Sequence, residues 1–81
     1  METIKKWLDD GKDIDVRYTC NGVFILLLGV QRIDNRSGKY HIAGDNSILS
    51  LDIQDVEVAQ DRVIVRTTQG GKAVFQESDL I

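Results

Sequence analysis

The sequence predicts a mostly β domain that begins with one helix and continues as five to six antiparallel strands. Short stretches that alternate apolar and polar residues are separated by clusters of Gly, Asn and Asp, as is typical of strands joined by tight turns. No proline occurs among the 81 residues, so no stretch is disfavoured as a strand on that ground. The pair Asn21-Gly22 is the strongest short-range signal for a β-hairpin. Such a meander is expected to close as a small barrel or to form a strongly bent sheet, because both arrangements hide its edges.

Residues 2–10 are predicted to form a short helix that needs the sheet for its stability. Met1, Ile4, Trp7 and Leu8 fall on one stripe at helical spacing, and Gly11 is well placed to end the helix. A helix of about nine residues is marginal in isolation. We therefore expect its apolar stripe to pack against a face of the sheet.

The pair Asn21-Gly22 is predicted to join a strand at about residues 13–20 to a long strand at about 23–33. A type I′ turn needs positive φ at both central residues, which Asn and Gly tolerate. Counting outward from the turn gives the pairs Cys20 with Val23, Tyr18 with Ile25, Val16 with Leu27, and Ile14 with Gly29. Because this face is apolar on both strands, it is expected to point at the core. The other face of the second strand is apolar as well.

Weaker signals predict the remaining strands. A loop at residues 34–38 is followed by a strand at 39–43 and another at about 48–59. Within 48–59 the apolar residues change from odd to even positions, so a bulge, corner or break is expected near Gln54-Asp55. Strands at about 62–68 and 72–77 complete the prediction. A loop at Gln60-Asp61 would place Val58 opposite Val63, whereas a loop at residues 69–71 would place Val65 opposite Phe75.

The predicted order of elements, with its long second strand, looks like an SH3-like or Sm-like small barrel. The stretch Gly11-Lys12, Asn21-Gly22, Gly29 and Asp34 is similar in rhythm to the first half of the Sm-fold RNA-binding proteins. The similarity covers about a third of the chain, and the second half carries no Sm signature. It is an architectural analogy, and it does not assign the chain to that family.

The second apolar face of the strand at 23–33 is the main functional clue. It carries Phe24, Leu26, Leu28 and Val30. The N-terminal helix could cover this strip, a protein partner could bind it, or it could line a groove for a small molecule. Our hypothesis is a non-enzymatic binding or assembly module that uses the strip to contact a protein partner or itself, most simply as a homodimer. Trp7 would then be either the cover or part of the contact.

An alternative hypothesis is the binding of RNA or single-stranded DNA by an Sm-like oligomeric ring. Basic residues and an aromatic residue gather around the second loop, namely Arg32, Arg36, Lys39, Tyr40 and His41. Such a set can hold phosphates and stack a base. The net charge of −3 argues against a generally basic surface.

Composition argues against several other classes of function. With one histidine, His41, and one cysteine, Cys20, no zinc site is expected within one chain, and no cofactor or other metal is expected. No acid–base pair, nucleophile–base pair or cofactor loop is recognisable, so we do not expect an enzyme. The lone cysteine, the absence of a signal peptide and the lack of a run of about 20 apolar residues predict a cytoplasmic protein without membrane contact.

Overall fold

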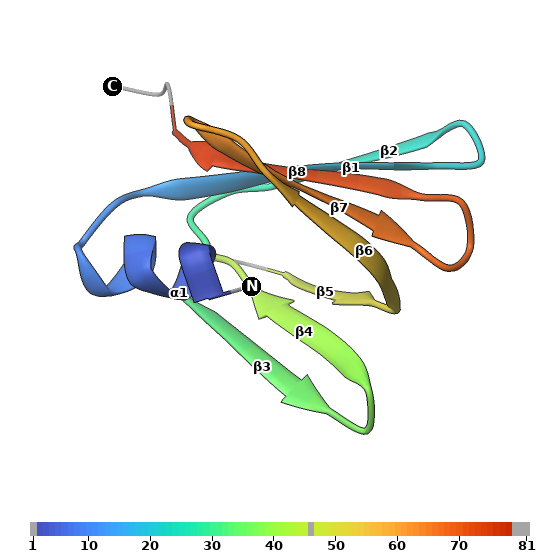
Figure 1. The fold of residues 1–81 in the computed structure, drawn as a ribbon, viewed down its shortest axis with the longest axis horizontal. Coiled ribbons are helices and arrows are strands. Elements are labelled where there is room, and N and C mark those ends of the chain that lie inside the picture. Colours follow the sequence, from blue (N-terminus) through green and yellow to red (C-terminus); the bar gives the residue numbers. More distant parts are fainter. Residues whose placement is uncertain (1, 46, 79–81) are drawn as a thin grey trace.

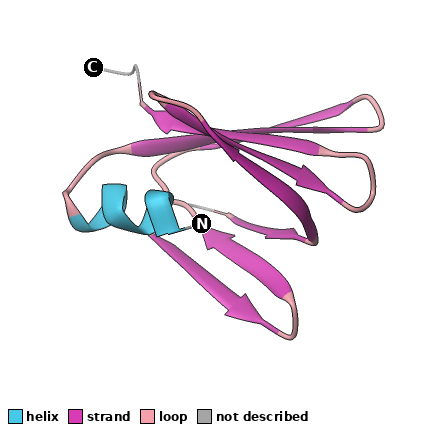
Figure 2. Cartoon of the chain, in the orientation of Figure 1, coloured by secondary structure: helices cyan, strands magenta, loops and turns pink. Residues whose placement is uncertain are grey.

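The computed structural model describes residues 2–45 and 47–78, so Met1 of the predicted helical stripe lies outside the described residues. One helix, α1 (Glu2–Asp9), precedes the strands (Figures 1 and 2). The strands are β1 (Ile14–Cys20), β2 (Val23–Leu27), β3 (Arg32–Arg36), β4 (Lys39–Ala43), β5 (Ile48–Leu51), β6 (Ile53–Val58), β7 (Arg62–Thr67) and β8 (Lys72–Glu77). They form a five-stranded sheet in the order β2-β1-β8-β7-β6 and a three-stranded sheet in the order β3-β4-β5.

The prediction of a mostly β chain with an N-terminal helix is confirmed, and every strand pair in the described residues is antiparallel. The two sheets are not closed into a barrel, so that part of the prediction is not confirmed. The described residues contain eight strands where five to six were expected, because each of the two long predicted strands is divided. The segment 23–33 splits into β2 and β3, which belong to different sheets, and 48–59 splits into β5 and β6.

The predicted β1–β2 hairpin forms around a turn with positive φ at both central residues, 52° at Asn21 and 79° at Gly22. The expected pairs form from Cys20–Val23 to Val16–Leu27. The fourth expected pair, Ile14 with Gly29, does not form. The chain turns away after β2, and the Ile14 carbonyl accepts a hydrogen bond from the Val30 N–H at 2.9 Å instead.

Two later hairpins test the other predicted registers. Val58 lies opposite Val63 as expected, and the register shifts between Ile53 and Asp55, close to the predicted irregularity. The predicted pairing of β7 with β8 is wrong by two residues, because Val65 pairs with Ala73 and Phe75 pairs with Val63. The turn lies one residue earlier than expected because Gly70, with a φ of 83°, supplies the left-handed residue that ends a short hairpin loop.

The loop predicted at residues 34–38 is also wrong, since most of it is strand. Arg36 pairs directly with Lys39, so β3 and β4 are joined by the tight turn Ser37-Gly38. Both turn residues have positive φ, 55° at Ser37 and 80° at Gly38.

Both sheets and the helix contribute to one apolar core. Its fully buried members include Ile4 from α1, Phe75 from β8 and Ile42 from β4. The helix contacts β3 and lies at the end of the molecule opposite to the β1–β2 turn (Figure 1). At the start of β1, three successive residues are buried, whereas the half of β1 near the turn is partly exposed.

The β7–β8 loop is closed by a buried hydrogen bond that provides a test of the fold. The Gly71 N–H donates to Thr67 Oγ1 at 2.8 Å, and the Thr67 side chain is almost fully buried. Replacing Thr67→Val keeps the shape but leaves this N–H without an acceptor, so we expect a loss of about 1–2 kcal/mol in the free energy of unfolding. Thr67→Ser keeps the hydroxyl and should cost clearly less. Urea denaturation of both variants measures the difference, and equal losses would contradict the assignment.

Candidate protein-interaction surface

Large apolar side chains are exposed on both faces of β2 and just beyond it. The exposed fractions are 59% for Val23, 61% for Phe24, 40% for Ile25, 48% for Leu26 and 38% for Leu28. We call these five residues the hairpin patch. Contiguous apolar exposure of this kind on a small protein commonly marks a contact surface.

The hairpin patch is exposed because the β1–β2 hairpin projects past the smaller sheet (Figure 1). Only Leu27, at the end of β2 far from the turn, reaches the core, where it is 3% exposed. Val23 and Ile25 lie on the same face as Leu27, the face that was expected to point at the core. Both are nevertheless exposed, because no layer covers them in the described part of the chain.

Val30, the last member of the strip predicted from the sequence, is buried and does not belong to the surface. Gly29 has a φ of 62°, so the strand direction breaks before Val30 is reached. The Gly29 N–H donates to Asp15 Oδ1 at 3.2 Å, which holds this corner against β1. The corner turns Val30 inward, and the chain then enters the smaller sheet as β3.

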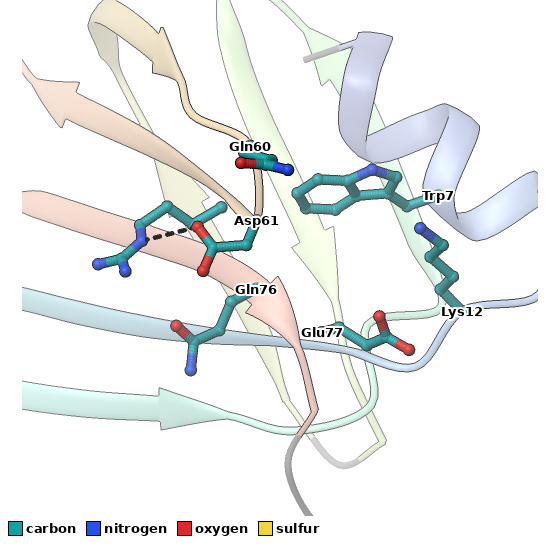
Figure 3. Close-up of a pocket in the computed structure, with 7 residues that line it drawn as sticks. Trp7, Lys12, Gln60, Asp61, Gln76 and Glu77 are labelled. Atoms are coloured by element: carbon teal, nitrogen blue, oxygen red, sulfur yellow. Dashed lines mark hydrogen bonds and ion pairs between the residues drawn. The ribbon is translucent and has the colours of Figure 1, made fainter.

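The helix does not cover the hairpin patch, because it packs against β3 at the far end of the molecule. Trp7 instead lines an open hollow of about 510 Å³ with residues from the β6–β7 turn and the end of β8 (Figure 3). The Lys12 ammonium lies 5.8 Å from the centre of the indole ring. Trp7 thus packs against the core and lines this hollow, and it does not cover the hairpin patch.

Each of the other three sheet edges in the described chain carries a feature that discourages strand pairing. On β6, the Asp55 and Glu57 carboxylates pair with Arg66 at 3.2 and 3.3 Å, and the strand contains the register shift. The edge strand β3 carries three charged residues, and β5 has only four residues. Charges, bulges and short length are the usual protections of an exposed edge. β2 has no charge and no register shift, so its edge is the one without protection.

The residues of the nucleic-acid hypothesis lie on the smaller sheet, and their charges are compensated by nearby carboxylates. Arg32 Nε and Arg36 Nη2 lie 3.0 and 3.9 Å from Asp34 Oδ2. Lys39 Nζ lies 3.6 Å from Asp52 Oδ2. Tyr40 is half-buried against the core, which leaves less of its ring for stacking on a base. This arrangement gives phosphate binding little local excess of positive charge.

His41 has a partner that the sequence pattern did not reveal. Its Nδ1 lies 2.8 Å from Ser50 Oγ, across the β4–β5 pair. Asp34 lies opposite His41 on the other side, but its carboxylate is engaged by arginines. Among the described residues, no group of three His, Cys, Asp or Glu side chains is placed to hold a metal ion.

Tyr18 and Cys20 lie on β1 beside the hairpin patch. The Cys20 thiol is half-buried and directed at the Gln69 carbonyl, 3.9 Å from the sulfur. The pKa of Tyr18 is raised above its ordinary value, first by its hydrogen bond with Cys20 and then by burial, while a hydrogen bond with Thr67 opposes the shift. Tyr18 is therefore a neutral phenol at physiological pH, and its side chain brings no charge to this part of the sheet.

Comparison with known proteins does not place the chain in a family: no family model, no curated protein and no solved structure matches it. The helix that the structure describes is too short and too polar to span a bilayer. The feature of the surface that bears most on function is the uncharged edge strand β2.

Proposed function

We propose that this chain is a non-enzymatic assembly module that contacts another protein chain through β2. The observation that carries the proposal is the combination of an unprotected sheet edge with the hairpin patch around it. Addition of a strand to a free edge supplies main-chain hydrogen bonds, and the exposed side chains supply the apolar area that is removed from water. The other exposed apolar residues of the two sheets lie singly or beside charged neighbours.

The same features would be harmful to a chain that remains alone. Val23–Leu27 is apolar, free of charge and proline, and rich in residues that favour strands, which is the composition of an aggregation-prone segment. A protein partner that normally covers this edge would prevent such aggregation. The proposal therefore accounts for both the sequence of β2 and its position.

Leu26→Asp tests the proposal directly. A carboxylate at the centre of the covered edge would have to lose its hydration on association, so we expect the complex to weaken by at least about tenfold. Ile48→Asp is the matched control, since Ile48 is 70% exposed on β5 and outside the hairpin patch. Light scattering behind size exclusion, over a range of protein concentrations, gives the mass of each variant.

We expect Leu26→Asp to associate or aggregate less than the wild type, whereas Ile48→Asp should behave like the wild type. Circular dichroism shows whether each variant keeps its fold. If Leu26→Asp folds and its mass and solubility equal those of the wild type, the side chain is exposed without use and the proposal fails.

A further inference from the structure

The outer edge of β2 offers a small and well-defined set of free backbone groups. In an antiparallel pair, every second residue directs its N–H and C=O toward the same neighbour. The two residues that flank a two-residue turn form a hydrogen-bonded pair, so Val23 and the other odd-numbered residues of β2 direct their backbone N–H and C=O toward β1. The backbone groups of Phe24, Leu26 and Leu28 point outward, away from β1. The Leu28 carbonyl accepts from the Asp45 N–H at 3.1 Å, so Phe24 and Leu26 form the free part of the edge in the described chain.

The exposed side chains restrict what can occupy this edge. Val23 and Ile25 are exposed on one face of the sheet, and Phe24 and Leu26 on the other. A surface that docked on one face would leave the other face in water. A strand added at the edge contacts both faces, and it must itself be apolar on both faces to cover them.

A second copy of β2 meets this requirement. It is apolar on both faces and carries no charge, so self-pairing brings no like charges together. The opposite edge of the same sheet, β6, would bring Asp55 and Glu57 to the contact. The chemistry of the edge thus favours β2 against β2 over a head-to-tail chain of sheets.

We propose, on the basis of the function proposed above, that two copies pair antiparallel through β2 about a two-fold axis at Ile25. This register sets Phe24 of each copy opposite Leu26 of the other. Each such pair exchanges two hydrogen bonds, so the four free groups of each edge are all satisfied. The two five-stranded sheets become one continuous sheet.

Neighbouring registers satisfy fewer groups. An axis at Leu26 would set Phe24 opposite Leu28, whose carbonyl already accepts from Asp45. An axis at Phe24 would set Leu26 opposite Gly22, which lies in the turn and has a φ of 79°. The axis at Ile25 is therefore the register in which both free residues have a free partner.

The available area predicts a weak dimer. The hairpin patch exposes on the order of 400 Å², which is in the range of functional patches on monomeric proteins. An interface of standard size takes about 800 Å² from each partner, so this contact is small even when the paired backbone is added. We expect dissociation in the micromolar range.

Cysteine cross-linking tests the axis. In a Cys20→Ser background, Ile25→Cys places the two thiols at the axis as a non-hydrogen-bonded pair, with Cα atoms about 4.5 Å apart. That separation lies within the range of about 4.4–6.8 Å that a disulfide requires. In the same register, the two copies of Val23→Cys lie roughly 13 Å apart along the strands. Val23 is the more exposed of the two side chains, so random collisions favour this control.

The expected result on mild oxidation is a covalent dimer that forms at least tenfold faster for Ile25→Cys than for Val23→Cys. Val58→Cys, on the β6 edge, gives the rate of random collisions. Equal rates for Ile25→Cys and Val23→Cys would overturn the register.

Failure of this inference and failure of the proposed function give different results. A wild-type complex that Leu26→Asp dissociates, with Ile25→Cys no faster than Val58→Cys, would overturn the two-fold axis and leave the function of β2 standing. A wild-type chain that is monomeric throughout the micromolar range, and in which Leu26→Asp changes neither mass nor solubility, would overturn both.

Discussion

Phe75→Ala is expected to lower the free energy of unfolding by about 3–5 kcal/mol, the largest loss for any single truncation of this chain. Phe75 is fully buried on β8, between Val16 of β1 and Val63 of β7. Removing the ring leaves a cavity in a core to which both sheets contribute. Because domains of this kind are stable by only about 5–15 kcal/mol, this loss removes a large share of the stability and should clearly lower the urea midpoint. Urea denaturation followed by the fluorescence of Trp7, the single tryptophan, measures the loss.

Phe24→Ala is the matched control, because it removes the same atoms from an exposed position. At a concentration where the chain is monomeric, we expect a change within about 0.5 kcal/mol. At higher concentration, Phe24→Ala should weaken the proposed dimer while Phe75→Ala acts on the monomer. A loss in Phe24→Ala as large as that in Phe75→Ala would show that Phe24 is buried within one chain and would contradict the exposed hairpin patch.

Local turn chemistry made part of the fold predictable from the sequence. Asn21 and Gly22 can both take positive φ at low cost, so the type I′ turn fixed the register of five residue pairs at once. The change of phase in the apolar pattern located the irregularity near Gln54 for a similar reason, since a strand cannot change its buried face without one. The β7–β8 register was missed because either of two adjacent glycines could end the loop, and Gly70 takes that place.

The candidate site was predictable only in part. The pattern showed that Phe24, Leu26 and Leu28 share a face with polar neighbours, and all three are exposed. It did not show that Val23 and Ile25 are exposed too, because an apolar face was equated with a covered face. Coverage depends on how far the second sheet extends, which is a property of the whole fold. The continuous apolar run 23–28, which does not alternate, is the signal in the sequence that both faces would be apolar.

The division of the predicted strand 23–33 explains the limits of the site. An apolar pattern continues across residues 28–31, so it gave no sign of a break, whereas Gly29 was read as one more strand position. In the structure the Asp15 carboxylate binds the Gly29 N–H, and the corner sends Val30 into the core. The free edge therefore ends before Leu28, whose carbonyl accepts from the Asp45 N–H, and the contact surface is shorter than the predicted strip.

Gly29→Ala is expected to be the second most damaging of these substitutions, with a loss of about 2–3 kcal/mol, the sum of a backbone cost and of the displacement of one side chain. Gly29 has a φ of 62°, a conformation that costs an L-residue free energy. A Cβ at this position would also lie 2.6 Å from both carboxylate oxygens of Asp45. The Asp45 side chain is exposed, so its carboxylate can move into solvent, but it then gives up the hydrogen bond from Gln31 Nε2 at 3.3 Å.

Two comparisons separate the backbone cost from the collision. Gly22→Ala has a φ of 79° and no atom within 4 Å of its new Cβ, so it should lose only about 1–2 kcal/mol. The double variant Gly29→Ala/Asp45→Ala removes the collision. Its free energy of unfolding should therefore be lower than that of Asp45→Ala alone by only about 1–2 kcal/mol, as for Gly22→Ala. If Gly29→Ala costs no more than Gly22→Ala, the Asp45 carboxylate does not crowd the corner. If Gly29→Ala loses no stability and Val30 stays protected from solvent, the corner does not depend on glycine. The hydrogen bond from the Gly29 N–H to Asp15 would then be the feature that forms the corner.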